Sequence, residues 1–123
     1  MTDKTQPSEK YAVYENAHDL IVIIVKKGLS EKVLDSAKKA GAEGGTIIYG
    51  RGTGIHEKAK LFGIPIEPEK EIIFIVIEKR KTKKVLDFIV SSTDLNKPGI
   101  GIAFVIELSK VLGICHGLNY EQC

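Results

Sequence analysis

The sequence predicts an α+β fold in which one strand–helix–strand unit occurs twice. The Lys-Val-Leu-Asp sequence at residues 32–35 recurs at residues 84–87, an offset of 52 positions (84 − 32). The same offset carries the apolar run at residues 20–25 onto the apolar run at residues 72–77. Two copies are too few for a solenoid, so the repeat indicates two similar units within one domain.

The first unit begins with a buried strand over residues 20–25, which are rich in β-branched side chains. Ser30 is predicted to cap the helix that follows, because its hydroxyl can accept a hydrogen bond from a free backbone N–H. Apolar side chains then recur at helical spacing until Gly41, which is expected to end the helix. Residues 46–49 form the second strand of the unit.

The second unit repeats this order. Residues 72–77 are predicted to form a strand, and Thr82 is the expected cap of the second helix. Residues 93–99 form its exit loop and residues 102–106 form the last strand. The resulting βαββαβ order is that of a ferredoxin-like sandwich with an antiparallel four-stranded sheet.

The repeat also sets the expected domain boundaries. Residues 1–17 precede it and are expected to form a flexible N-terminal arm. The ferredoxin-like domain is expected to span residues 18–116, with a long loop at about residues 50–69. Residues 117–123 are the expected C-terminal tail.

Composition narrows the classes of protein to consider. A chain of 123 residues, 43% hydrophobic and 28% charged, suits one compact domain and excludes a wholly disordered one. Its net charge of +2 is too small for a protein that binds nucleic acid non-specifically through a large positive charge. The N-terminus has no apolar signal-peptide core, and the apolar runs are far shorter than the about 20 residues of a membrane span. Two cysteines near the C-terminus imply no disulfide framework, so we expect a soluble cytoplasmic protein.

Three of the four predicted strands, at residues 20–25, 72–77 and 102–106, are apolar on both faces. Two helices can cover only one face of a four-stranded sheet, so the other face would expose more apolar surface than a monomer usually tolerates. Burying that surface, at about 25 cal/mol per Å², favours association. We therefore predict a closed homo-oligomer with its open sheet faces turned inward.

The connection between the two units, residues 50–69, is much longer than a hairpin needs. Its glycines at positions 50, 52 and 54 would let backbone amides approach a ligand, and Arg51 adds a guanidinium suited to phosphate. A second pair, Gly99 and Gly101, opens the last strand. We expect association to bring one subunit's glycine cluster near a neighbour's, which would form a cleft. The alternative is that both clusters serve only as turns.

Residues 20–113 resemble the PII nitrogen-regulatory proteins and their PII-like relatives. The resemblance rests on the order and spacing of four features. These are Lys26 at the end of the first strand, Gly-Ala-Glu-Gly-Gly-Thr at residues 41–46, Gly-Thr-Gly at residues 52–54 and Gly-Ile-Gly-Ile-Ala-Phe-Val at residues 99–105.

The resemblance implies a homotrimer with adenine-nucleotide sites in clefts between subunits and a long loop that docks on target proteins. It implies a regulator rather than an enzyme, although it leaves nucleotide hydrolysis open. The effector would be AMP, ADP or ATP, with or without magnesium, and no cofactor is obligatory. The target would be a metabolic enzyme or a membrane transporter in nitrogen or carbon metabolism, and a transporter would recruit the protein to the membrane. No nucleic-acid partner is expected.

The resemblance also assigns roles to individual residues. Thr46 matches the residue that contacts adenine, Gly52 and Gly54 match the base of the mobile loop, and Gly99 and Gly101 match the loop beside the phosphates. The expected nucleotide-binding set is completed by Arg51, Thr53 and Ile100. The expected partner-binding residues of the long loop are His56, Lys58, Phe62 and Ile64.

Three positions depart from the family pattern. Ile102 stands where a lysine follows the phosphate loop, and Gly113 and Cys115 stand where the family has arginines. Each charge-assisted contact contributes about 1.5–3 kcal/mol, so losing three weakens the case for tight triphosphate binding. A ligand with one or two phosphates is one alternative. The candidate replacement cations are Arg51, Lys58 and Lys60.

Two other function classes stay open. An enzyme on the same scaffold would need a base or nucleophile with partners, and His56 has no evident partner in the sequence. A trimeric small-molecule or metal-ion carrier would need convergent ligands, which the Cys115-His116 pair offers only thinly. The basic run at residues 79–84 lacks interleaved aromatic side chains, so we expect a solvated helix end rather than a nucleic-acid site.

Overall fold

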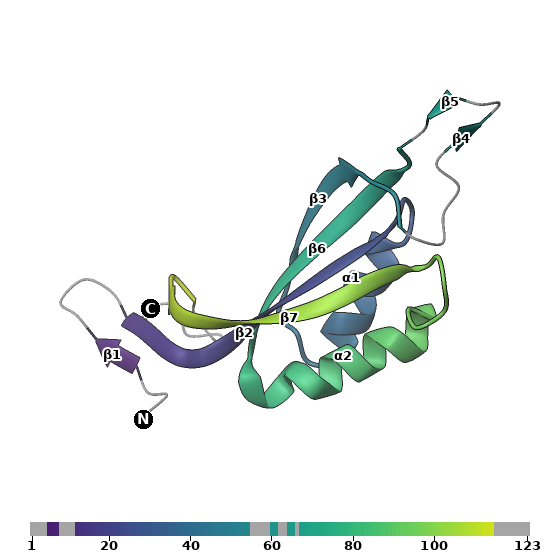
Figure 1. The fold of residues 1–123 in the computed structure, drawn as a ribbon. Coiled ribbons are helices and arrows are strands. Elements are labelled where there is room, and N and C mark those ends of the chain that lie inside the picture. Colours follow the sequence, from purple (N-terminus) through teal and green to yellow (C-terminus); the bar gives the residue numbers. More distant parts are fainter. Residues whose placement is uncertain (1–4, 8–11, 55–59, 62–63, 66, 115–123) are drawn as a thin grey trace.

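The computed structural model describes residues 5–7, 12–54, 60–61, 64–65 and 67–114 (Figure 1). Its strands are β1 (Thr5–Pro7), β2 (Ala12–Lys26), β3 (Thr46–Arg51), β4 (Lys60–Leu61), β5 (Ile64–Pro65), β6 (Glu69–Glu78) and β7 (Gly101–Leu112). Its helices are α1 (Ser30–Lys39) and α2 (Lys79–Thr93). Neither helix in this described part is long and apolar enough to cross a lipid bilayer.

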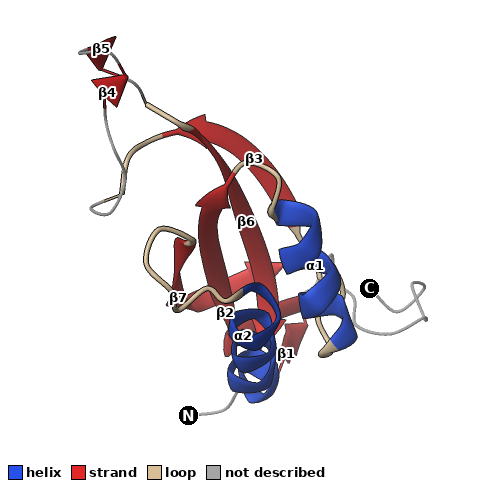
Figure 2. Ribbon diagram, turned by 90° about the vertical axis from the view of Figure 1, so that its right-hand side faces the viewer, coloured by secondary structure: helices blue, strands red, loops and turns tan. Residues whose placement is uncertain are grey.

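Strands β2 and β6 lie at the centre of an antiparallel sheet whose edges are β7 and β3. The order across the sheet is therefore β7-β2-β6-β3, and the short β1 pairs with the N-terminal end of β2. Both helices cover the same face of this sheet (Figures 1 and 2). The predicted ferredoxin-like βαββαβ fold is confirmed.

The hydrophobic core lies between the sheet and the two helices. Ile21 and Ile23 on β2 and Ile73 and Ile75 on β6 are fully buried. Side chains alternate between the faces of a strand, so these odd-numbered residues all point toward the helices. The helix residues that complete the fully buried core are Val33, Ala37, Val85 and Ile89.

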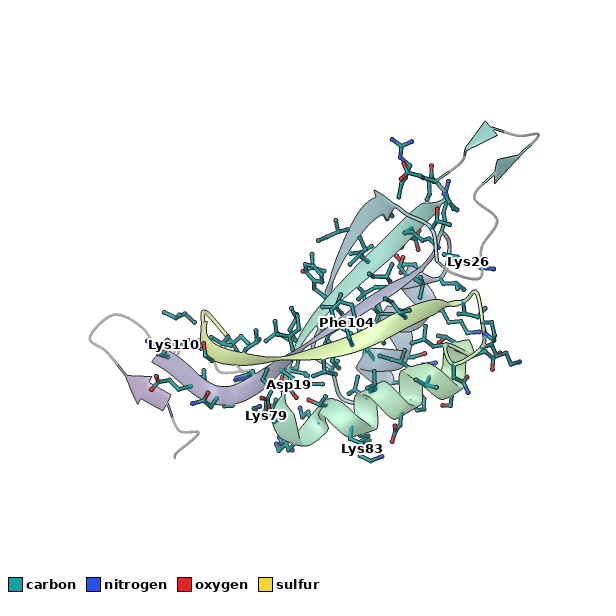
Figure 3. All side chains as sticks on the ribbon, in the orientation of Figure 1. Asp19, Lys26, Lys79, Lys83, Phe104 and Lys110 are labelled. Carbon is teal, nitrogen blue, oxygen red and sulfur yellow. The ribbon has the colours of Figure 1, made fainter. Side chains whose placement is uncertain are left out.

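The face without helices, which we call the open face, carries the even-numbered residues of β3, β6 and β7. Its exposed apolar side chains are Ile48, Val76, Ile102, Phe104 and Ile106, each 41% to 58% exposed. Phe104 lies near the middle of β7 (Figure 3). The predicted uncovered apolar face is therefore present, and the oligomer that would bury it stays a prediction.

Strand β2 begins at Ala12, well before the predicted start at residue 20, so residues 12–17 of the expected N-terminal arm belong to the sheet. Strand β7 likewise runs past its predicted end and pairs Val13 with Leu112. A β-bulge, at which Asn16 has a φ of 55°, separates this extension from the rest of β2. The domain limits at residues 18 and 116 stay a prediction, and the expected tail lies outside the described residues.

Both helices begin differently from the prediction. Ser30 is the first residue of α1 rather than its cap, and its backbone N–H donates to Oε1 of Glu71 at 2.9 Å. Helix α2 begins at Lys79, so the predicted cap Thr82 lies inside the helix, where its hydroxyl donates to Oδ2 of Asp19 at 2.7 Å. In both cases a carboxylate from a sheet strand holds the first turns of the helix.

Candidate functional site

The two glycine clusters of the sequence meet at one end of the open face. A pocket of about 370 Å³ lies there between the end of β3 and the start of β7. This pocket, which we call the glycine pocket, is lined by Ile24, Gly50, Arg51, Gly52, Thr53, Gly54, Lys70, Ile72, Gly99, Gly101 and Ile102. Both clusters therefore meet within one chain, and the expected cleft between one subunit's cluster and a neighbour's stays a prediction. Ile100 does not line the pocket and packs against the core.

Strand pairing explains why these residues meet. The end of β3 opposes the start of β6, where Gly50 is paired with Lys70, and Lys70 is paired in turn with Lys26 at the end of β2. The end of β2 opposes the start of β7, where Val25 is paired with Gly101. Four strand ends therefore gather at the end of the sheet that Lys26 marks in Figure 3.

The charged residues of the glycine pocket are both cations. Arg51 is exposed at the end of β3, whereas Lys70 on β6 is only 9% exposed. Among the described residues that line the pocket there is no carboxylate. Two cations beside a glycine-rich backbone form a site suited to an anion, because backbone N–H groups and charged donors can converge on its oxygen atoms.

Lys70 is the site residue that sequence reasoning missed. Alternation along β6 places it on the same face as Ile72, a signal present in the sequence. The pairing of Lys70 with Gly50, which brings it to the glycines, is visible only in the structure. Of the candidate replacement cations, Arg51 lines the pocket, Lys60 lies in β4 and Lys58 lies outside the described residues.

The neighbours of Lys70 on β6 tie this strand to the helix side of the sheet. Oε1 of Glu69 lies 2.9 Å from Nζ of Lys27, and this hydrogen bond and charge lower the pKa of Glu69 and raise that of Lys27. Hydrogen bonds from Ser30 hold the pKa of the Glu71 carboxyl below its ordinary value. The start of β6 is therefore anchored directly behind the glycine pocket.

The glycines of the pocket serve different purposes. A Cβ added to Gly101 would collide with the backbone carbonyl of Ile24, so this glycine is required by the close approach of β2 and β7. Gly99 has a φ of 83°, which side chains other than that of glycine rarely adopt. A Cβ added to Gly52 would meet no atom within 4 Å. Packing therefore does not require glycine at position 52.

Thr46 lies at the other end of β3, in a second pocket of about 500 Å³. Arg51 lies five positions further along β3 (51 − 46), a distance of roughly 16 Å along a strand. This pocket, which we call the Thr46 pocket, is lined by Leu20, Gly41, Glu43, Gly44, Gly45, Thr46, Phe74, Val76, Ile77, Glu78, Lys81, Gly113 and Ile114. The structure thus separates Thr46 from the other predicted nucleotide-binding residues.

The Thr46 pocket differs from the glycine pocket in charge. It contains the carboxylates of Glu43 and Glu78 and the single ammonium group of Lys81. Nζ of Lys81 lies 3.4 Å from Oε1 of Glu78 and 3.4 Å from the carbonyl oxygen of Gly41, so it is already engaged. A lining that combines apolar side chains with two carboxylates suits an uncharged ring better than a phosphate.

The predicted partner-binding loop contains a short hairpin rather than loop throughout. Strands β4 and β5 pair Lys60 with Pro65, and Ile64 lies in β5. The N–H of Gly52 donates to the carbonyl of Pro68 at 3.1 Å and closes the base of this segment. The other predicted partner-binding residues, His56, Lys58 and Phe62, lie outside the described residues.

The described residues contain no group of three His, Cys, Asp or Glu side chains that could hold a metal ion. His18 is buried on β2, with its ring 5.2 Å from that of Tyr14 in an edge-to-face arrangement. The candidate carrier ligands Cys115 and His116, and the candidate enzyme base His56, lie outside the described part of the chain.

Comparison with known proteins bears on this geometry. A profile of the family described as "Nitrogen regulatory protein P-II" matches residues 18–117. Among solved structures, the chain is similar to Arabidopsis thaliana PII bound to citrate, with a TM-score of 0.60 and 22% sequence identity over 76% of this chain and 79% of that chain. A comparison with curated proteins found no match. The structural likeness supports the fold, and the profile spans both strand–helix–strand units.

Proposed function

The chain belongs to the nitrogen regulatory protein P-II family, and from this premise we propose that it senses an adenine nucleotide and reports it to a target protein. The proposed effector is AMP, ADP or ATP, with or without magnesium. The protein acts as a regulator, with a metabolic enzyme or a membrane transporter as its target and the cytoplasm as its compartment.

The observation that supports nucleotide sensing is the glycine pocket. Lys70 and Arg51 offer two cations to a phosphate in a pocket with no carboxylate among its described lining residues. Each charge-assisted hydrogen bond contributes about 1.5–3 kcal/mol. Lys70 thus compensates in part for the family cations that Ile102 and Gly113 replace. Because two cations neutralise less charge than a triphosphate carries, we expect magnesium to strengthen the binding of ATP more than that of AMP.

The two pockets together favour a site shared between subunits. A phosphate suits the glycine pocket and a base suits the Thr46 pocket, but the two lie at opposite ends of β3 in one chain. Both open near the apolar open face, which association would bury. We therefore propose a trimer in which the glycine pocket of one subunit lies beside the Thr46 pocket of the next.

The signal would pass through the long connection between β3 and β6. Its first residues, Gly52 to Gly54, line the glycine pocket, so a bound phosphate would contact the base of the segment that includes β4 and β5. A nucleotide that binds one arrangement of this segment better than another shifts the population between them. A target protein that recognises one arrangement of the segment then binds more tightly or more weakly. Its binding free energy changes by the same amount as that of the nucleotide.

Isothermal titration calorimetry with AMP, ADP and ATP, each with and without magnesium, tests the proposal. We expect the purified chain to bind at least one of them with a Kd below about 1 mM, which corresponds to about −4 kcal/mol. Gly52→Leu and Thr46→Phe should each weaken binding at least tenfold, because each fills one pocket. Ser91→Leu on the exposed side of α2 adds similar bulk far from both pockets and should leave binding unchanged.

Three results would contradict the proposal or the site assigned in it. Absence of binding for all three nucleotides would remove the sensor function, and binding of a divalent cation alone would support the carrier function instead. Nucleotide binding that survives both Gly52→Leu and Thr46→Phe would place the nucleotide elsewhere on the molecule.

A further inference from the structure

Phe74 occupies a particular place in the Thr46 pocket. It is the residue of β6 that is paired directly with Thr46 on β3, and both side chains lie on the open face. Side chains paired in this way have Cβ atoms about 4.5–5.5 Å apart. The phenyl ring and the hydroxyl therefore stand next to each other in one pocket, and the ring is partly exposed.

Phe74 is the only aromatic residue among those lining this pocket in the described part of the chain. Its neighbours on the same face of β6 are the aliphatic Ile72 and Val76, which are branched and offer no flat surface. An aromatic ring presents a planar face on which a nucleobase can stack, irrespective of which base it is. The adjacent hydroxyl of Thr46 can then donate to, or accept from, a polar edge of that base.

Charge determines which end of a nucleotide enters this pocket. The carboxylates of Glu43 and Glu78 would repel a phosphate, whereas a neutral base has no such cost. The phosphates of the nucleotide would therefore bind to the cations of the glycine pocket. We propose that Phe74 is the stacking platform for the nucleobase and that it positions the base edge against Thr46, an inference that rests on the proposed nucleotide binding.

Two measurements test this role. In the wild-type protein, nuclear magnetic resonance of bound ATP should show the base protons H2 and H8 shifted upfield by the ring current of a stacked phenyl ring. Phe74→Leu should abolish that shift and weaken ATP binding at least about fivefold, since stacking on an aromatic side chain contributes at least about 1 kcal/mol per base. Phe74→Tyr, which keeps the ring, should retain both the shift and the affinity.

Inorganic tripolyphosphate serves as a ligand without a base. Its affinity should be the same for the wild type and for Phe74→Leu, because the phosphates are bound by the glycine pocket. The control Phe88→Leu removes a more exposed ring from the outer side of α2 and should change neither ligand's affinity. Size-exclusion chromatography of each variant verifies that its assembly equals that of the wild type.

The outcomes separate this inference from the function on which it rests. If the wild type binds ATP without an upfield shift of H2 and H8, or if Phe74→Leu binds ATP as tightly as the wild type, Phe74 is not the platform while nucleotide sensing stands. Equal losses of ATP and tripolyphosphate affinity in Phe74→Leu would also overturn the role, because they indicate general damage. If the wild type binds no nucleotide, both proposals fail together.

Discussion

Glu71 shows how much one residue can organise around the candidate site. It lies on β6 next to Lys70, yet its carboxylate faces the other side of the sheet and accepts the N–H of Ser30 at the start of α1. The free N–H groups and the dipole of a helix N-terminus both favour a negative charge there. The cap of α1 is therefore supplied by a residue 41 positions away along the chain (71 − 30).

The Glu71 cap makes stability depend on pH in a defined direction. Its pKa in the folded state lies below the ordinary value of 4.5, so folding favours the ionised carboxylate. The stabilisation is fully present above about pH 4.5 and is lost as the pH falls through the lower folded-state pKa. Glu71→Gln should lower the free energy of unfolding at pH 7 by about 1–2 kcal/mol and make its decline in acid shallower.

Urea denaturation of the wild type and Glu71→Gln between pH 3 and pH 7 measures this effect. Glu67→Gln, at an exposed position before β6, is the control and should follow the wild type. Parallel pH profiles for the wild type and Glu71→Gln would show that the cap does not contribute as described.

Two glycines of the glycine pocket should differ in how strongly the same substitution affects stability. Gly101→Ala places a Cβ against the carbonyl of Ile24 and should lower the free energy of unfolding by at least about 2 kcal/mol. Gly52→Ala meets no neighbouring atom and should stay within about 1 kcal/mol of the wild type. Chemical denaturation of both variants compares them, and equal losses of stability would contradict the distinction.

At the scale of elements, the start of α2 departs from the usual charge preference of helices. Its first turn contains Lys79, Arg80 and Lys81 and no acidic residue, although a helix N-terminus favours negative charge. Carboxylates outside the helix offset these cations. Nζ of Lys79 lies 2.9 Å from Oε2 of Glu107 on β7 and 3.4 Å from Oδ1 of Asp19 on β2. Figure 3 labels Asp19 and Lys79 next to each other at the start of α2.

Asp19 is therefore expected to hold α2 on the sheet. It is 7% exposed and accepts the Thr82 hydroxyl as well as facing Lys79. Asp19→Ala should lower the free energy of unfolding by about 1–3 kcal/mol, because it removes the acceptor at 2.7 Å from the Thr82 hydroxyl and leaves that hydroxyl only the Glu78 carbonyl at 3.5 Å. Asp87→Ala breaks an exposed pair with Lys83 within the same helix and should cost about 0.5 kcal/mol or less.

Thermal unfolding followed by circular dichroism compares Asp19→Ala with Asp87→Ala. A larger loss of stability for Asp87→Ala would mean that helix-surface pairs, rather than the contact with β2, hold α2 in place.

At the scale of the whole molecule, the open face determines whether the proposed shared site can exist. Phe104 and Ile102 on β7 and Val76 on β6 leave an apolar surface exposed in the single chain. Burying such a surface between subunits removes apolar area from water, and a buried lysine head group would oppose that burial. Assembly and nucleotide binding should therefore be lost together when a charge is placed there.

Phe104→Lys should convert the protein to single chains of 13.5 kDa, whereas the wild type should sediment as a trimer of about 40 kDa (3 × 13.5). Phe88→Lys, at a similarly exposed phenylalanine on α2, should remain assembled. Analytical ultracentrifugation at micromolar concentration distinguishes these states. A wild-type protein that sediments as a single chain would contradict the shared site.

The sequence by itself determined the order of the elements. Unbroken apolar runs at 20–25 and 72–77, the helical spacing after each run and Gly41 at the end of α1 are all local patterns, so they can be recognised without knowing the fold. The order and spacing of the glycine-containing segments likewise indicated the family that the profile match establishes.

Only the tertiary structure decided what depends on strand register. Residues 12–17 show no clear alternation, and they form a strand because they pair with the end of β7. Lys70 became a pocket residue because it is paired with Gly50, and Thr46 was separated from the glycines by the length of β3. Strand register pairs residues that are distant in the chain. The residues around each partner in the sequence do not specify which residue of the neighbouring strand it will be paired with.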